Sequence, residues 1–443
     1  LSLVIILISC SEETATSMEA AAEPMEIMLP EASETAEIEA LLHEHIAVLA
    51  SDDFEGRAPA TPGEEKTIAY LEQQFKSLGI GPGNADSYFQ SVAVTEITTS
   101  SDAILQLQGS DYDATFNYGQ EMMVGTQQQI PFVTVQGSEV VFVGYGIVAP
   151  ERNWNDYANV DVTDKTVIIL VNDPGYATQD PEIFNGNAMT YYGRWTYKYE
   201  EAARQGAAAA LIVHETGPAG YGWDVVSGSW SGPQIGLEAE NLNGDRTEIE
   251  GWLTLPSAEA VFDGAGLSYQ ELKAAAAQPG FQAVPLADIK ASVSIENSVR
   301  TSESQNVVAA IPGSLRPQET VIYTAHWDHL GVNPEIEGDN IYNGAADNAT
   351  GTAGLLALAK LHTESTPPER TVVFLAVTAE ESGLLGSKWY AEHPIYPIPT
   401  TVANINIDVL NTFSKMKDIV VVGAGSSELE DYLEVAAATQ NRY

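Results

Sequence analysis

Cysteine and basic residues are scarce in this sequence. Cys10 is the only cysteine among 443 residues, which excludes an intramolecular disulfide and a cysteine-based metal site. Lysine and arginine number 19 against 62 aspartate and glutamate residues, so the formal net charge is −43. A field of that sign repels nucleic acid and anionic membrane surfaces, and neither is expected as a partner. The acidic excess is typical of a solvated surface.

The apolar run from Leu1 to Ile8 is too short to cross a bilayer, and it ends at Ser9-Cys10. It resembles the end of a bacterial lipoprotein signal, with Leu7-Ile8-Ser9-Cys10 as the lipobox and Cys10 as the lipid anchor. The acidic stretch to Glu37 is then a flexible tether, and the start without Met indicates a fragment that lost its first residues. The alternative is an ordinary cleaved signal with an incidental cysteine. Both interpretations predict an exported protein, either a cell-envelope lipoprotein or a secreted one.

A length of 443 residues is about three times the roughly 150 residues typical of one domain, which predicts two or three domains. Residues 1–37 are expected to form the signal and tether. Residues 38–136 and 297–443 are expected to form two parts of a main domain, and residues 137–296 an insert between them.

The segment from residue 297 onward alternates predicted strands with helices, as an α/β fold with a doubly wound sheet does. The runs are nearly continuous in Val, Ile and Leu, which indicates strands buried on both faces and therefore a mostly parallel sheet. The main helix is predicted over Gly351–His362. The predicted strands are Asn306–Ile311, Thr320–Ala325, Thr371–Thr378, Val402–Ile407 and Asp418–Val422.

Side chains that can bind metals follow three of these strands. His326 and Asp328 follow the second strand, Glu380-Glu381 the third and Asp408 the fourth, and Asp347 lies in a glycine-bounded loop before the main helix. In a parallel sheet the strand ends meet at one edge, where ionised carboxylates would repel one another unless divalent cations neutralised them.

Each of these residues also has a plain structural interpretation. Asp347 could cap a helix, His326 could be a satisfied core histidine, and Glu380-Glu381 could be a solvated pair. Their joint spacing favours a metal site instead. Imidazole and carboxylate ligands without sulfur indicate zinc, with cobalt or manganese as replacements.

Four ordered motifs carry a resemblance to metallopeptidase family 28, the family of bacterial zinc aminopeptidases and glutamate carboxypeptidases. The motifs are His326-Trp-Asp-His-Leu-Gly, Asn343-Gly-Ala-Ala-Asp-Asn-Ala-Thr-Gly, Thr378-Ala-Glu-Glu-Ser-Gly-Leu-Leu-Gly-Ser and Asn404-Ile-Asn-Ile-Asp. The resemblance implies a zinc exopeptidase with two zinc ions and peptide substrates. It is close over 300–425, moderate over 38–90 and loose over the insert.

The resemblance also implies roles for individual residues. Asp347 would bridge both zinc ions, His326 and Asp408 would complete one of them, and Glu381 would bind the other. Glu380 would be the general base that takes a proton from a metal-activated water and passes it to the leaving amine. Asp328 would orient the His326 imidazole.

One further histidine is expected by the family pattern after the strand that ends in Asp408, and no histidine follows His393 here. We therefore expect a C-terminally truncated sequence whose second zinc site is incomplete and whose own activity is in doubt. His329 has no role that the resemblance supplies, and a purely structural role is expected for it.

The segment 137–296 resembles the protease-associated domain inserted in many secreted peptidases, through its order of strand, strand, helix and strand. The elements that carry this resemblance are Glu139–Gly146, Asn153–Tyr157, Thr166–Val171, Tyr199–Gln205 and Ala208–Val213. Aminopeptidase activity is the favoured function. A glutaminyl cyclase of the same fold and a noncatalytic binding protein are the alternatives, while substrate side-chain preference, dipeptidase or carboxypeptidase activity and oligomeric state stay open.

Overall fold

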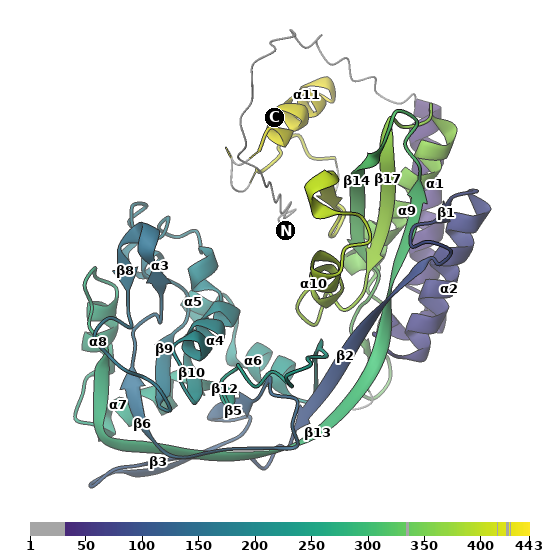
Figure 1. The fold of residues 1–443 in the computed structure, drawn as a ribbon. Helices are drawn as coiled ribbons and strands as arrows, with labels where there is room; N and C mark the ends of the chain where they lie inside the picture. The colour runs from purple at the N-terminus through teal and green to yellow at the C-terminus, as the bar shows by residue number, and fades with distance from the viewer. Residues whose placement is uncertain (1–31, 334–335, 414, 422–424, 426) are drawn as a thin grey trace. The chain divides into compact units, whose positions relative to one another are not determined.

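Figure 1 shows the computed structural model, which describes residues 32–333, 336–413, 415–421, 425 and 427–443. Contacts divide the described residues into two compact units: unit 1 comprises those up to Ala93 and from Ser302 onward, and unit 2 comprises Val94–Thr301. The strands β2 (Phe89–Thr99) and β13 (Val284–Ile311) each run from one unit into the other. Residues 94–136, which the sequence analysis groups with the main domain, make their contacts within unit 2. The predicted lipobox around Cys10 lies outside the described residues.

Unit 1 is an α/β structure that contains the predicted site residues. Its elements other than the shared strands are α1 (Ala32–Leu49), η1 (Asp52–Arg57), α2 (Pro62–Ser77), β1 (Gly81–Pro82), β14 (Arg316–His326), β15 (Gly331–Val332), β16 (Ile341–Tyr342), η4 (Ala345–Ala349), α9 (Thr350–Glu364), β17 (Arg370–Val377), α10 (Leu385–Glu392), η5 (Ile398–Thr400), β18 (Thr401–Asn406) and α11 (Leu429–Thr439).

The sheet of unit 1 has the order β18-β14-β17-β13. Strands β14, β17 and β18 are parallel, with Tyr323 opposite both Phe374 and Ile405, whereas β13 pairs with β17 in the antiparallel direction. The prediction of a mostly parallel sheet is confirmed for these central strands. The predicted strand Asp418–Val422 is wrong over its described residues 418–421, which form no strand.

Alternate residues of these strands enter two different cores, which is why the runs are apolar throughout. One face, including Phe374 and Val307, packs against Phe75 of α2 and Leu355 of α9. The opposite face, including Leu375, packs against Tyr390 of α10 in a smaller core. Burial of each such side chain contributes about 1.5–3 kcal/mol. Figure 1 shows α1, α2 and α9 together beside β14 and β17.

Unit 2 contains a second set of parallel strands in the order β6-β9-β10-β12, with β5 antiparallel at its edge. Two cores again flank the strands, one around Phe142 and Phe262 and one around Ile212 and Tyr199. Its elements are β3 (Ile104–Gln108), β4 (Asp113–Asn117), β5 (Met122–Gly125), β6 (Phe132–Phe142), β7 (Val148–Ala149), η2 (Pro150–Arg152), β8 (Trp154–Asn155), β9 (Thr166–Leu170), α3 (Pro174–Thr178), η3 (Tyr191–Gly193), α4 (Trp195–Arg204), β10 (Ala209–His214), α5 (Thr216–Ala219), α6 (Trp223–Trp230), β11 (Pro233–Leu237), β12 (Ile249–Thr254), α7 (Leu255–Gly264) and α8 (Tyr269–Ala276).

The helices of the described residues include none with the length and apolar character needed to cross a membrane.

Candidate metal centre

The carboxyl ends of three neighbouring parallel strands bring the predicted site residues to one edge of the unit 1 sheet. His326 is the last residue of the central strand β14, and Asp328 follows it. Glu380 and Glu381 follow β17 on one side, and Asp408 follows β18 on the other. Because strand order places β14 between β17 and β18, the imidazole lies between the two sets of carboxylates.

Asp347 reaches the same edge from the loop that precedes α9. The neighbouring Asn348 is fully buried and fixes this loop, since its Nδ2 donates to the carbonyl oxygen of Ile407 at 3.0 Å. Its Oδ1 accepts hydrogen bonds from the backbone N–H of Gly351 and of Val409. Asn348 therefore ties the Asp347 loop to both the start of α9 and the Asp408 segment.

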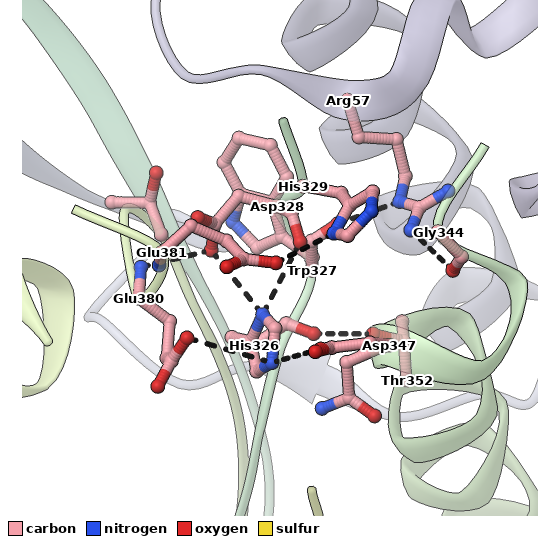
Figure 2. A network of polar contacts seen from close by, with 12 residues as sticks. Arg57, His326, Trp327, Asp328, His329, Gly344, Asp347, Thr352, Glu380 and Glu381 are labelled. Atoms are coloured by element: carbon pink, nitrogen blue, oxygen red, sulfur yellow. Dashed lines mark hydrogen bonds and ion pairs between the residues drawn. The ribbon is translucent and has the colours of Figure 1, made fainter. Parts of the chain in front are cut away.

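The buried imidazole of His326 is the centre of the arrangement, as Figure 2 shows. Its Nε2 lies 3.1 Å from Asp347 Oδ1, 3.3 Å from Asp408 Oδ1 and 3.8 Å from Glu380 Oε2. Its Nδ1 lies 3.2 Å from the backbone oxygen of Asp328, which can only accept, so Nδ1 carries the proton. Nε2 consequently faces carboxylate oxygens, and either a proton or a metal ion has to lie between them.

Asp328 contacts the backbone of the neighbouring strand end. Its fully buried carboxylate accepts hydrogen bonds from the N–H groups of Glu380 at 3.1 Å and Glu381 at 3.3 Å. The same carboxylate lies 3.7 Å from His326 Nδ1, farther than the Asp328 carbonyl oxygen. Asp328 therefore sets the position of both glutamates, while its backbone carbonyl orients the imidazole.

The negative charges of the clustered carboxylates shift the pKa values of His326 and Glu380. Burial lowers the pKa of His326, but the carboxylates of Asp328, Asp347 and Asp408 outweigh that effect and raise it to about 12. Burial raises the pKa of Glu380 to about 7; His326 opposes the rise and the charges of Asp408, Asp328 and Glu381 add to it. Burial and the neighbouring carboxylates thus disfavour the charged form of Glu380, while the carboxylates around His326 favour its charged form.

The donor set fits zinc. Ligands at 2.0–2.2 Å from a tetrahedral ion are about 3.4 Å apart, which is close to the spacings of Asp347 and Asp408 from Nε2. Asp347 Oδ1 is buried and has no hydrogen-bond partner of adequate geometry, as expected of an oxygen aimed at an ion. Two groups of donor atoms meet within 4.8 Å: His326, Asp347 and Asp408 form one, and His329, Asp347 and Glu381 form the other. Asp347 belongs to both.

Two residues at this edge carry interactions for which the sequence analysis assigned no site role. Nδ1 of His329 lies 2.5 Å from Glu381 Oε1. Arg57, in η1, is buried, and its guanidinium donates to the carbonyl oxygens of Trp327, Asn343 and Gly344, as Figure 2 shows for part of this network.

Arg57 therefore fixes to η1 two of the segments that hold site residues, the one after β14 and the loop before α9. Glycine at 344 is required, because a Cβ there would lie 2.5 Å from the Arg57 guanidinium. The sequence offers little to predict the role of Arg57 beyond its place after Gly56 in Glu55-Gly56-Arg57. Its hydrogen bonds go to backbone atoms, which no sequence pattern identifies.

Comparison with known proteins shows what the residues of this site are similar to. Residues 306–443 match the model of peptidase family M28. Aminopeptidase NAALADL1 of Mus musculus is 32% identical over 167 residues, which are 35% of this chain and 20% of that protein. Aminopeptidase YwaD of Bacillus subtilis (strain 168) is 32% identical over 111 residues, 25% of this chain and 22% of that protein. The matches thus span about a fifth of the length of these curated relatives.

A solved structure, an aminopeptidase from Aneurinibacillus sp. strain AM-1, aligns with 84% of this chain and 70% of its own, at 22% identity and a TM-score of 0.46.

Proposed function

Since residues 306–443 belong to peptidase family M28, we propose that this protein is a zinc-dependent exopeptidase, most specifically an aminopeptidase. The observation that carries the proposal is the convergence of Asp347, Asp408 and Glu380 on one buried imidazole. Among the described residues, no lysine or arginine side chain forms an ion pair with these carboxylates. The negative charge of these carboxylates is therefore not neutralised by lysine or arginine. Metal ions and the terminal ammonium group of a peptide can both supply the positive charge.

Two zinc ions are proposed for the site. His326, Asp347 and Asp408 would hold one, and Asp347 with Glu381 would hold the other. When bound, zinc lowers the pKa of a water molecule and polarises the carbonyl of the scissile peptide.

Glu380 acts as the general base in this proposal. Its side chain is partly exposed, which leaves it accessible to water, and its raised pKa of about 7 suits proton exchange at neutral pH. It accepts a proton from the attacking water and donates it to the nitrogen of the leaving amine. Asp328 keeps Glu380 in reach of the reacting atoms through the backbone hydrogen bond at 3.1 Å.

The proposal also covers the inserted domain and the N-terminal segment. We propose residues 137–296, within unit 2, as the protease-associated-like insert, supported by the parallel strands β9 and β10 with the intervening helix α4. Export is proposed from Leu7–Cys10, with Cys10 as the lipid anchor of an envelope protein or as part of a cleaved signal.

The test compares aminoacyl anilides that carry a free or an acetylated amine, before and after chelation and zinc return. We expect hydrolysis of the free-amine substrate only, abolished by the chelator and restored by zinc. Equal hydrolysis of the blocked substrate would contradict an aminopeptidase. Cyclisation of an N-terminal glutamine without peptide-bond hydrolysis would indicate a glutaminyl cyclase.

The Glu380→Gln variant tests the base. We expect it to retain zinc and to lose about 10²–10⁴-fold in kcat, the usual contribution of a general base. Glu392→Gln is the matched control, because Glu392 is an exposed glutamate at the end of α10. Near-normal turnover by metal-replete Glu380→Gln would remove Glu380 from this role.

A further inference from the structure

His329 and Glu381 form a close contact between two strand ends. His329 follows β14, Glu381 follows β17, and Nδ1 of the imidazole lies 2.5 Å from Oε1 of the carboxylate (Figure 2). Both side chains are mostly shielded from solvent, with exposed fractions of 14% and 22%. Two ligands of the same zinc ion would be about 3.4 Å apart. The contact is therefore a hydrogen bond, with His329 as donor and Glu381 as acceptor.

Both partners are held in place from their backbones. The N–H of His329 donates to the carbonyl oxygen of Arg57 at 3.2 Å, and the N–H of Glu381 donates to Asp328 Oδ2. Gly344 leaves room for the ring, because a Cβ at that position would lie 2.6 Å from His329 Cδ2. The hydrogen bond between the side chains thus removes the remaining rotational freedom of the Glu381 carboxylate.

We propose that His329 is a positioning residue for the second metal ion: it holds one oxygen of Glu381 by a hydrogen bond and presents the other to the ion. The inference rests on the proposed two-zinc function. Among the described residues, His329 is the one side chain with a charge-assisted contact to Glu381. Without it the carboxylate would rotate among several orientations, and only some of them face Asp347. Hydrogen bonds to ligating carboxylates commonly contribute 10–100-fold in metal affinity.

Three variants of the full chain separate this role from its alternatives. His329→Ala removes the donor. His329→Asn keeps one, because Nδ2 of asparagine is bonded to Cγ just as Nδ1 of histidine is, whereas an amide is a poor zinc ligand. His393→Ala is the control, since His393 is an exposed histidine that stacks on Trp389 of α10.

The measurement is the number of zinc ions per chain and the affinity of each, from titration against a chromophoric chelator. We expect His329→Ala to weaken the second ion about 10–100-fold and to leave the first unchanged. His329→Asn should recover most of that loss, and His393→Ala should match the wild type.

Two results would overturn the inference alone. Equal affinities in the wild type and His329→Ala would show that Glu381 needs no such support. An Asn variant as weak as the Ala variant would show that the imidazole binds the ion directly. A wild-type chain that binds no second ion even at saturating zinc would instead overturn the two-zinc proposal, and this inference with it.

Discussion

The two units place similar residues at the same topological position and use them differently. In unit 2, Asp173 follows β9, and His214 and Glu215 stand at the end of β10, so a histidine and two carboxylates lie at the carboxyl ends of parallel strands. Asp173 accepts hydrogen bonds from the backbone of Gly175 and Thr190. Glu215 accepts from Tyr269 and pairs with Lys273. Every carboxylate there has a neutralising or donating partner.

At the strand ends of unit 1 the carboxylates are partnered differently. Asp328 accepts backbone hydrogen bonds and Glu381 contacts His329. Asp347, Asp408 and Glu380 converge on His326. The nearby basic side chain, Arg57, directs its guanidinium to backbone carbonyls. Within the described residues, groups suited to hold a metal ion occur only in unit 1. The difference indicates that a cluster of strand-end carboxylates predicts a metal site when no lysine or arginine side chain pairs with it.

The largest effect is expected when the shared carboxylate, Asp347, is removed. Asp347→Asn preserves shape but removes the charge proposed to bridge two ions, and we expect zinc affinity to fall by more than about 100-fold. Asp173→Asn is the matched change in unit 2, and it should alter stability but not zinc content. Zinc per chain, measured by elemental analysis, checks both. Retention of two ions by Asp347→Asn would contradict the dependence of metal binding on the unit 1 carboxylates.

The stability of unit 1 should depend on Arg57, a buried arginine that forms no ion pair with a carboxylate. Arg57→Met leaves buried carbonyl oxygens without donors, and we expect the free energy of unfolding to fall by about 3 kcal/mol. Arg300→Met in unit 2 is the control, because Arg300 is an exposed arginine paired with Glu96 and its loss should cost under about 1 kcal/mol. Urea unfolding measures both, and equal losses would contradict the structural role of Arg57.

A smaller effect is expected from the partnered carboxylate of unit 2. Glu215→Gln weakens a part-buried, charge-assisted contact with Lys273 and should lower the free energy of unfolding by about 2 kcal/mol. Zinc content and peptide hydrolysis should not change. A loss of zinc in this variant would mean that unit 2 also contributes to metal binding.

The smallest effect, per pH unit, is a pH dependence of the stability of unit 2. Burial lowers the pKa of Lys198 to about 7, against which Asp156 and Asp173 act. Between pH 7 and 9 the unfolded chain holds the ammonium proton and the folded chain releases it, so the free energy of unfolding should rise with pH, by at most about 1.4 kcal/mol per pH unit. Lys198→Met should flatten this slope in urea unfolding at pH 7, 8 and 9. An unchanged slope would assign it to other groups.

Much of unit 1 was predictable because its strands are continuous apolar runs that end in charged residues. The α/β fold class and the M28 resemblance are confirmed, and the predicted ligands His326, Asp347, Glu381 and Asp408 lie together, although their roles stay predictions. The strand at 418–421 failed because a short apolar run alone does not specify pairing.

Other features depend on tertiary contacts that no local pattern marks. For strand β13, only the last six residues, 306–311, were predicted. The earlier part of this strand alternates exposed and buried residues and lacks a continuous apolar run. The hydrogen bond from His329 to Glu381 joins residues 52 positions apart, and each of the two has a common structural interpretation when considered alone. The guanidinium of Arg57 binds backbone atoms, which have no sequence signature at all.

The hydrogen bonds of Arg57 also affect the order in which the candidate metal centre forms during folding. They join residues 270 to 287 positions apart, so the loops around His326 and Asp347 reach their final spacing only after the N-terminal helices have docked. Closing so large a loop is a late and slow event in folding. Metal capture should accordingly be the last step of maturation, and the stretch 306–443 produced by itself would carry the ligands without the arginine that spaces them.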